Sequence, residues 1–366
     1  MVTRPIIPPW DEGSKNTAWQ IASKTCEHKF YLMTTQNKAL PKANSVKWIR
    51  TYTDKNLRGI QRFKLLLYLM YSNPKADIYH FLFVPTLLTS LLLYTIVMQK
   101  NKRSIQTVPT LYRPVKSSKL ARLLFFGDKV VVLSDWTADK LYSLGLDNIV
   151  RINAGVDLHR FRPVRDKTRS RRHLNLPESK ILALFSGELS RLGSLEIMLS
   201  IAPQLIQENS NLHLVFASPT RKPEDFLRRK EAERLIRSQG LEKSVTFLGD
   251  VDDILSLLNA CDMLLYPVST MLGKIDTPLT VLEAMASELP VILTDLPPLN
   301  EVFKDETAGV AVLPGDNQAL VRAILELADD KMRRCKMGKK GRRIVEDHYS
   351  LQDMVQSYKI LYNELT

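Results

Sequence analysis

Cysteine is scarce in this chain. The 366 residues include three cysteines, Cys26, Cys261 and Cys335, which lie far apart in the sequence. A disulfide framework or a structural zinc site needs clustered cysteines, so the sequence argues against both and fits a reducing compartment. The first 15 residues also lack an apolar core, which predicts that no signal peptide is present. Because 45% of all residues are hydrophobic, a wholly disordered chain is excluded.

Acidic residues are scarce in the first half of the chain. Residues 1–165 carry 26 Lys and Arg against 10 Asp and Glu, a net charge of +16, whereas residues 166–366 carry a net charge of −3. This split predicts two domains, one of which faces an anionic partner. A membrane surface, a nucleic acid and a phosphorylated substrate would each fit. No nucleic-acid-binding motif accompanies the charge, so we expect no nucleic-acid partner.

A single long stretch lacks charge altogether. It begins at His80 with HFLFVPTLLTSLLLYTIVM, and its 19 residues approach the length of a membrane-spanning helix. Pro85 interrupts the stretch, and threonine and serine are interspersed in it. We therefore predict a buried strand over 78–84 and a buried helix over 86–98. Three basic residues follow at once, so contact with a membrane surface stays open.

Short apolar runs alternate with segments of helical period through most of the chain. This rhythm is typical of parallel sheets that carry helices on both faces, so the sequence predicts an α/β fold. We interpret the polar, basic stretch 161–179 as a linker between two domains, and a final helix is predicted over about 349–365. The predicted strands cover 30–34, 78–84, 105–108, 129–134, 149–152, 181–186, 212–217, 244–248, 262–266, 290–294 and 309–313.

The first candidate motif is FSGELSRLG, at residues 185–193. A predicted strand ends at Ser186, Gly187 follows, and a helix is predicted to begin near Ser194. Backbone N–H groups after such a glycine can bind a phosphate together with the positive end of the helix, and Arg191 would add a full charge. A glycine after a strand is also a common turn, so the motif by itself leaves both interpretations open.

The second candidate motif is LGKIDTPLTVLEAMASELPVILTD, at residues 272–295. Gly273 and Pro278 shape a loop, a helix is predicted to begin near Thr280, and Glu283 falls in its first turn. Loop amides and a carboxylate can bind a sugar diphosphate and a pair of ribose hydroxyls, because ionised oxygens accept strong hydrogen bonds. The alternative is that Glu283 only interacts favourably with the helix dipole.

The third candidate motif is PIIPPWDEGSKNTAW, at residues 5–19. An apolar start leads into a proline-rich loop, then to Glu12, Gly13 and Ser14, and then to a helix. Such a turn can bring the backbone close to a ligand at the carboxyl edge of a parallel sheet. An ordinary turn between a strand and a helix is the alternative.

The chain resembles the retaining glycosyltransferases of family 4 in consecutive stretches over about residues 130–350. These stretches are VVVLSDWTADKL, RINAGVDLHRFRP, LFSGELSRLGSLEIML, VTFLGDVDDILSLLNACDMLLYPV, PLTVLEAMASELPVILTD and GVAVLPGD. The resemblance implies a GT-B fold, in which two Rossmann-like domains face each other across a cleft. It implies an acceptor-side domain over 1–162, a domain over 163–345 that binds a nucleotide sugar, and a helix in 346–366 that packs back toward the first domain.

The resemblance also assigns roles to single residues. Glu283 matches the second glutamate of the family's E-x7-E signature, which implies contact with the ribose of the donor. The loop whose amides hold the sugar and diphosphate corresponds to Pro278, Leu279 and Thr280, and Gly187 matches the phosphate-loop glycine. PPWDEGSKN resembles the family's first glycine-containing loop, and this places Glu12, Gly13 and Ser14 on the acceptor side.

The sequence departs from the family pattern where charged or polar groups are expected. Ile275, Glu188, Leu192 and Pro109 stand in place of a glutamate, an arginine, a lysine and a histidine. A leaving nucleoside diphosphate gains negative charge, so two lost cations would cost several factors of ten in rate unless other groups replace them. The expected catalytic substitutes are Asp276 at the sugar, Arg191 as the cation, and His80 as a polar group at another strand end.

The reaction implied by the resemblance is hexose transfer from a UDP- or GDP-linked sugar to a hydroxyl, with retention. The leaving phosphate is expected to take the acceptor's proton, and neither a cofactor nor a metal is expected. The segment Asp250-Val251-Asp252 resembles the DxD metal motif of another glycosyltransferase fold. We interpret it instead as preceding and capping a helix over 252–259.

The resemblance offers an explanation for the positive charge of the first half of the chain. This charge fits anionic lipid headgroups or a lipid-linked acceptor, and a glycan acceptor is the other option. We therefore expect a cytoplasmic enzyme, peripheral on the inner face of the cell membrane, in the synthesis of a glycolipid or polysaccharide precursor. The departures leave a non-catalytic nucleotide-sugar-binding or partner protein open as an alternative. A third hypothesis is an epimerase or phosphorylase with the GT-B fold, although the sequence shows no pyridoxal-site motif.

Overall fold

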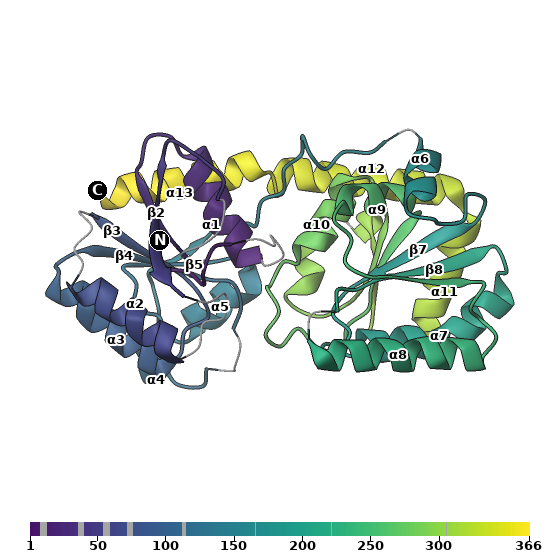
Figure 1. Cartoon of the computed structure of the whole chain (residues 1–366), viewed down its shortest axis with the longest axis horizontal. Coiled ribbons are helices and arrows are strands. Elements are labelled where there is room, and N and C mark those ends of the chain that lie inside the picture. The colour runs from purple at the N-terminus through teal and green to yellow at the C-terminus, as the bar shows by residue number, and fades with distance from the viewer. Residues whose placement is uncertain are drawn as a thin grey trace. The chain divides into compact units, whose positions relative to one another are not determined.

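The computed structural model describes residues 1–7, 13–35, 40–53, 59–71, 76–111, 115–164, 166–220, 222–304 and 306–366. The chain divides into two compact units, each built from parallel strands connected through helices (Figure 1). Unit 1 comprises Met1–Gly155, Gly273–Asp276 and Leu351–Thr366, and unit 2 comprises Val156–Leu272 and Thr277–Ser350. Glu12 of the predicted acceptor-side loop lies outside the described residues.

Unit 1 contains a four-stranded parallel sheet and a parallel strand pair. The sheet has the order β3 (Ile78–Leu82), β4 (Arg103–Val108), β5 (Lys129–Val132) and β6 (Ile149–Arg151), and the pair is β1 (Phe30–Thr35) with β2 (Val46–Tyr52). The N-terminal segment connects the two sets. Val2 exchanges backbone hydrogen bonds with His80 and Leu82 of β3, and the Ile6 N–H donates to Met33 of β1 at 3.1 Å.

Helices cover both faces of these strands. Phe81 and Leu82 point to opposite faces because side chains alternate along a strand. Leu82 packs in a cluster with α1 (Gly13–Lys24) and α13 (Leu351–Leu365), and Phe81 packs in a cluster with α2 (Gly59–Tyr71) and α3 (Leu87–Gln99). The remaining helices of unit 1 are α4 (Ser118–Leu124) and α5 (Asp135–Ser143).

The uncharged stretch that begins at His80 forms β3 and α3 on either side of Pro85, as predicted. The expectation that α3 is buried is wrong for one of its faces, because Leu88 is 70% exposed and Met98 is 61% exposed. Across the described ranges, no helix is both long enough and apolar enough to cross a membrane.

Unit 2 contains a six-stranded parallel sheet in the order β12-β11-β10-β7-β8-β9. Its strands are β7 (Ile181–Ser186), β8 (Leu212–Ala217), β9 (Val245–Leu248), β10 (Met263–Tyr266), β11 (Val291–Thr294) and β12 (Val310–Val312). The chain builds from β7 to β9 in one direction and then from β10 to β12 in the other. The strand order therefore reverses between β7 and β10, and open α/β sheets bind ligands outside the carboxyl ends of the strands at such a point.

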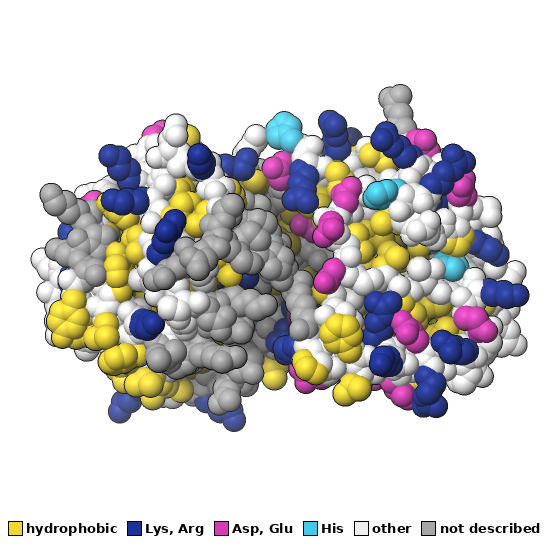
Figure 2. Space-filling model, viewed as in Figure 1, with side chains coloured by type: hydrophobic (Ala, Val, Ile, Leu, Met, Phe, Trp, Pro, Cys, Tyr) yellow, Lys and Arg dark blue, Asp and Glu magenta, His cyan; other side chains and the backbone are white. Residues whose placement is uncertain are grey.

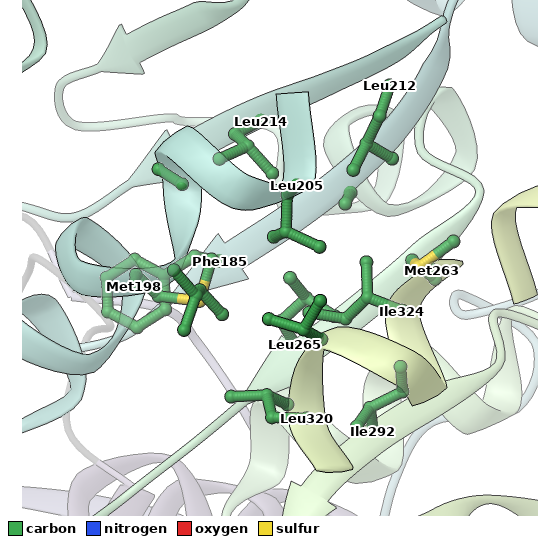
Figure 3. Packing of buried hydrophobic residues seen from close by; sticks show 14 of the residues in the cluster. Phe185, Met198, Leu205, Leu212, Leu214, Met263, Leu265, Ile292, Leu320 and Ile324 are labelled. Atoms are coloured by element: carbon green, nitrogen blue, oxygen red, sulfur yellow. The ribbon is translucent and has the colours of Figure 1, made fainter. Parts of the chain in front are cut away.

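Large apolar side chains fill the space between this sheet and its helices. Figure 3 shows Met198, Leu205 and Ile324 packed around the strand residues Phe185 and Leu265. The helices of unit 2 are α6 (Lys167–His173), α7 (Ser194–Glu208), α8 (Pro223–Ser238), α9 (Ile254–Ala260), α10 (Leu279–Ala286), α11 (Asn317–Asp329) and α12 (Lys331–His348). Short 3-10 helices span Leu299–Val302 and Glu306–Ala308.

A glycine lets α12 approach α10 closely. A Cβ atom on Gly338 would collide with the backbone of Glu288, just after the end of α10. Glu288 itself has a φ of +58°, a conformation that side chains other than glycine rarely adopt. This contact fixes α10, and with it the position of Glu283, against the rest of unit 2.

The interpretation of 161–179 as a linker is wrong. The chain enters unit 2 at Val156, and α6 lies within the supposed linker. Arg171 of α6 is buried and donates to Asp262 Oδ2 at 2.7 Å and to the Ala260 carbonyl at 2.9 Å. A basic residue can thus lie inside the fold, because an ion pair and carbonyl oxygens satisfy the charge of Arg171.

Candidate functional site

Two loops meet at the carboxyl edge of the unit 2 sheet. One follows β7 and ends at Gly193, and the other follows β10 and ends at Pro278. Since β7 and β10 are paired neighbours, both loops begin at the same edge. The Ser269 N–H donates to the Leu192 carbonyl at 2.7 Å, and Gly193 lies too close to Ser269 to carry a Cβ atom. The two loops are therefore tied together at the point where the strand order reverses.

The loop after β7 has the form that the sequence predicts. The strand ends at Ser186, and α7 begins at Ser194 after Gly193, whose φ is +70°. Within the described ranges the Gly187 N–H donates to no acceptor. A Cβ atom on Gly187 would lie 3.1 Å from the ring of Phe185, which is a tight contact. The loop therefore brings an unused backbone donor to the sheet edge, close to the start of a helix.

Arg191, the predicted cation of this loop, is ion-paired. Its Nε donates to one carboxylate oxygen of Glu188 at 2.7 Å, and an Nη atom donates to the other oxygen at 2.9 Å. The side chain of Arg191 is 46% exposed and that of Glu188 is 37% exposed. Ion pairs of such exposure contribute about 0–1 kcal/mol. A more highly charged anion can therefore compete for the guanidinium.

Leu192, where the family pattern has a lysine, turns its side chain inward. The side chain is 6% exposed, and the backbone has a φ of +73°. A non-glycine residue in this region costs about 1–2 kcal/mol. The hydrogen bond from Ser269 to the Leu192 carbonyl helps to hold this backbone. Leu192 therefore shapes the loop but supplies no charge to it.

The loop after β10 ends in a helix start with unused donors. Pro278 is the N-cap residue of α10, and its side chain makes no capping hydrogen bond. The backbone N–H groups of Leu279 and Thr280 have no acceptor in the part of the chain that the structure describes. Such unsatisfied amides at a helix N-terminus bind anions, because they donate hydrogen bonds and carry the positive end of the helix dipole.

Glu283 lies on α10, half-buried and without a partner. No hydrogen bond or ion pair reaches its carboxylate from any described residue. Burial raises the pKa of Glu283 from 4.5 to about 7, and the charge of Arg160 opposes this shift. The prediction that Glu283 falls in the first turn is wrong, since α10 begins at Leu279. The helix dipole acts mainly within the first turn, so the alternative of a dipole partner loses its basis.

Two polar groups that sequence reasoning missed lie at the ends of the strands on either side of β7. Tyr266 ends β10, and Ser218 directly follows β8. Both side chains are buried, and their hydroxyl oxygens make no hydrogen bond among the described residues. Burial raises the pKa of Tyr266, so its hydroxyl stays protonated and can donate. The sequence signal that could have found them is a polar residue at the carboxyl end of a buried strand.

Asp276, expected at the sugar, is bound inside unit 1. Its Oδ2 atom accepts hydrogen bonds from the hydroxyls of Ser134 and Thr137, each at 2.6 Å, and its N–H donates to the Pro109 carbonyl at 2.9 Å. The side chain is 1% exposed. Asp276 therefore anchors the segment 273–276 at the start of α5 and the end of β4.

His80 is not at a strand end, which corrects the expectation for its role. It lies in the middle of β3 and is 2% exposed. Its Nδ1 bonds to the Tyr362 hydroxyl at 2.7 Å, and its Nε2 bonds to the Thr107 hydroxyl at 2.8 Å. Burial lowers the pKa of His80 well below 6.5, with a smaller effect from the N-terminal charge. Both ring nitrogens are used in the core, so neither can reach a substrate.

The other predicted positions are less informative. Gly13 and Ser14 form the first turn of α1 and are half-buried. The segment Asp250-Val251-Asp252 precedes α9, but the capping residue is Asp253, whose side chain accepts from the Ser256 N–H at 3.1 Å. Among the described residues, no group of three or more His, Cys, Asp or Glu side chains could hold a metal ion.

Comparison with known proteins identifies a family for most of unit 2. Residues 166–344 match the model of the family described as Glycosyl transferases group 1. A GDP-mannose-dependent monoacylated alpha-(1-6)-phosphatidylinositol monomannoside mannosyltransferase of Corynebacterium glutamicum is 30% identical over 55% of this chain and 52% of that protein. A D-inositol 3-phosphate glycosyltransferase of Streptomyces avermitilis is 24% identical over 60% of this chain and 48% of that protein. The matches thus span about half the length of these relatives.

Solved structures share the fold of both units. Sucrose-phosphate synthase from Thermosynechococcus elongatus has a TM-score of 0.81 at 20% identity, over 97% of this chain and 94% of that chain. Anabaena HepE in complex with UDP and glucose has a TM-score of 0.78 at 15% identity, over 97% and 96%. At such identities the likeness concerns the fold alone. The fold is GT-B, with two Rossmann-like units.

Proposed function

We propose that this chain, whose residues 166–344 match the group 1 glycosyl transferases, transfers a sugar from a nucleotide-sugar donor to a hydroxyl acceptor. We assign donor binding to residues of unit 2, at the ends of the loops after β7 and β10. The observation that carries the proposal is the half-buried Glu283 carboxylate, which accepts no hydrogen bond from any described residue and lies four residues after the Leu279 amide at the start of α10.

The ribose and the sugar diphosphate would engage different parts of this site. Two neighbouring ribose hydroxyls would each donate to an oxygen of Glu283, and a carboxylate accepts such bonds best when ionised. The Leu279 and Thr280 amides would hold the diphosphate and sugar. The Gly187 amide and the start of α7 would bind phosphate from the other loop. Tyr266 and Ser218 offer further hydroxyls at the same edge.

Arg191 would stabilise the charge that develops on the leaving diphosphate. It must then exchange Glu188 for phosphate oxygens, which costs little because the ion pair is exposed. The positive ends of α7 and α10 act on the same charge, and preorganised dipoles need no rearrangement during the reaction. Because amides and a guanidinium would stabilise the charge on the leaving diphosphate, we propose that the reaction is independent of metal.

We propose transfer with retention, by attack on the face from which the diphosphate leaves. As the glycosidic bond breaks, a phosphate oxygen takes the acceptor's proton while the acceptor oxygen bonds to the anomeric carbon. No pair of carboxylates is required, in contrast to most glycoside hydrolases. The acceptor would bind at unit 1, and its basic sequence fits a lipid-linked or otherwise anionic acceptor and peripheral attachment to an anionic membrane.

The donor proposal is tested by thermal shift with UDP, GDP, ADP and their sugars. A ligand that binds the native state raises the melting temperature, by linkage to its dissociation constant. We expect one nucleotide series to stabilise the wild type and Glu283→Gln to lose most of that shift. Glu242→Gln, an exposed change in the same unit, is the matched control and should keep it. The absence of any shift with every nucleotide would contradict the proposal.

Transfer itself requires a separate assay. With the stabilising donor and lipid or glycan acceptors, we expect a product with the donor's anomeric configuration, which proton NMR of the new linkage determines. A chelator should leave the rate unchanged. An inverted product or chelator-sensitive transfer would contradict retention or metal independence respectively.

A further inference from the structure

The outer face of α3 is apolar and uncovered. The sequence of α3, LLTSLLLYTIVMQ, contains no charged residue. Ser90, Leu93, Ile96 and Val97 face the core of unit 1, and the opposite side is exposed. We define the α3 outer face as Leu87, Leu88, Leu91, Leu92, Tyr94 and Met98, which are between 37% and 70% exposed. A helix with apolar residues on all sides is normally buried on all sides. We therefore expect a binding partner to cover this face.

The neighbouring helix extends this surface. On α2, which packs beside α3 in the same cluster, Phe63 is 60% exposed and Tyr71 is 78% exposed. Figure 2 shows the apolar side chains gathered at the lower left, over the position of α3 in Figure 1, with basic side chains below them. Scattered single apolar residues on a surface are ordinary, but a contiguous patch marks an interaction site.

Cations border the α3 outer face on the side of α4. A groove of about 820 Å³ runs between the two helices, lined by Leu91 and Tyr94 of α3 and by Lys119, Arg122 and Leu123 of α4. Lys119 and Arg122 are exposed, and the described part of the chain gives neither an ion-pair partner. The groove also contains one acid, Asp147. The cations therefore outnumber the acid beside the apolar face.

We propose that the α3 outer face is the surface with which this protein docks on a bilayer of anionic lipids. The helix lies in the interface, with its leucines among the first carbons of the acyl chains. Lys119 and Arg122 contact lipid phosphates in the adjoining groove. Interfacial helices combine these features, an apolar face and cations at headgroup level, without spanning the membrane.

The charge distribution favours a bilayer over a protein partner. The face itself contains no charged group, and the groove beside it has two exposed cations against one acid, which matches an anionic surface. The two acids that flank the start of β4 are neutralised by their own partners, Asp77 by Lys102 and Asp128 by Arg103. A second copy of this chain would instead bring two like-charged borders together.

The position of the α3 outer face in unit 1 also suits an enzyme that acts on a lipid acceptor. Helix α3 follows β3, so its N-terminal residues Leu87 and Leu88 lie near the carboxyl edge of the unit 1 sheet. Ligands of such sheets bind at that edge. Docking through α3 therefore brings the lipid phase to the acceptor side of unit 1. This last step rests on the proposed function, whereas docking itself does not.

Cosedimentation with vesicles tests the proposal. The full chain is mixed with vesicles of phosphatidylcholine alone, or of phosphatidylcholine with phosphatidylglycerol. We expect binding to the mixed vesicles, weakened more than about tenfold by Leu88→Glu with Leu92→Glu, because neither side chain could then be buried among the acyl chains. Leu227→Glu, on the 69% exposed Leu227 of unit 2, is the matched control and should bind as the wild type does.

Two further variants separate insertion from electrostatic attraction. Lys119→Gln with Arg122→Gln should weaken binding about tenfold or more, since each cation near an anionic surface contributes about fivefold, and Lys230→Gln with Lys243→Gln should not. The fluorescence of the tryptophan introduced by Leu88→Trp should be quenched by brominated lipids. The fluorescence of the tryptophan introduced by Leu227→Trp should not. Circular dichroism and nucleotide thermal shifts confirm that each variant is folded and keeps its donor site.

Three results would overturn the proposal. The first is that the wild type binds neither kind of vesicle. The second is that the leucine variant binds as well as the wild type. The third is that the wild type is a dimer in light scattering, the leucine variant is a monomer, and neither binds vesicles. This result would assign the face to contact with a second copy of the chain. Because donor binding is measured separately, failure of the membrane proposal leaves the proposed transferase activity to be judged by its own assay.

Discussion

Glu188 holds the guanidinium of Arg191 by two parallel hydrogen bonds, at 2.7 and 2.9 Å, in the loop proposed to bind phosphate. The family pattern has a cation at the position of Glu188, so this chain has an acid where a positive charge is expected. The pair has no net charge, and it contributes to phosphate binding only when Glu188 gives up its partner. In the proposed site, Glu188 should therefore weaken donor binding.

Substitutions at this pair should act in opposite directions. Arg191→Gln should weaken binding of the nucleoside diphosphate about tenfold or more, since a hydrogen bond to a charged group contributes about 1.5–3 kcal/mol. Glu188→Gln should strengthen binding severalfold, because it removes the ion pair with the guanidinium and a like charge beside the phosphates. Calorimetric titration with the nucleotide measures both. Weaker binding in Glu188→Gln would contradict the role of Arg191.

Glu283 should make donor binding depend on pH. Burial raises its pKa to about 7, so at neutral pH the carboxyl group of the free protein is only partly ionised. Ribose hydroxyls favour the ionised form, so affinity should rise as pH increases through about 7 and then level off. Glu283→Gln should bind more weakly and lose this rise. Titrations at several pH values check it, and an unchanged profile in the variant would contradict ribose binding by Glu283.

The same group should also affect the stability of the free protein. Its pKa rises from 4.5 in the unfolded chain to about 7 in the fold, so the unfolded state loses its proton first. Wild type therefore loses stability as pH rises from 4.5 to about 7, and the loss is complete above that range. Above pH 7, Glu283→Gln should be more stable than wild type by about 1–3 kcal/mol, and denaturation at low pH should show no difference.

His80 should matter for stability and not for chemistry. His80→Ala leaves the hydroxyls of Thr107 and Tyr362 without a partner in the core, which should cost about 2–4 kcal/mol. Because burial lowers the pKa of His80, the wild type should lose stability as pH falls below 6.5, and the variant should lack this loss. Turnover per folded molecule should be unchanged. A loss of turnover in fully folded His80→Ala would restore a catalytic role.

The order of the predicted strands could be derived from the sequence because most buried strands contain a short apolar run. Every predicted strand has a counterpart in the structure. β2 was missed, and its Lys47 and Arg50 explain why: the strand is only half-buried, and basic residues there break the apolar pattern. α6 was missed for a related reason, because its charges are satisfied by residues distant in the sequence.

The candidate site was predicted in part. Strand-end position and motif were enough to select Gly187 and Glu283 as candidates, because both depend on local sequence, and their role in donor binding stays a prediction. The partners of Asp276 and His80 could not be predicted, since they lie 142 and 282 residues away in the chain. The pairing of Arg191 with Glu188 depends on the backbone path of a loop that contains Leu192 at positive φ, which local propensities disfavour.

Hydrogen exchange with and without the nucleotide sugar tests most directly whether the donor binds where the strand order of unit 2 reverses. The account predicts slower exchange in peptides that contain Gly187 and in those that contain Leu279 and Thr280, with no such effect in Glu283→Gln at the same ligand concentration. Tight binding of the donor without slower exchange at either loop would contradict it.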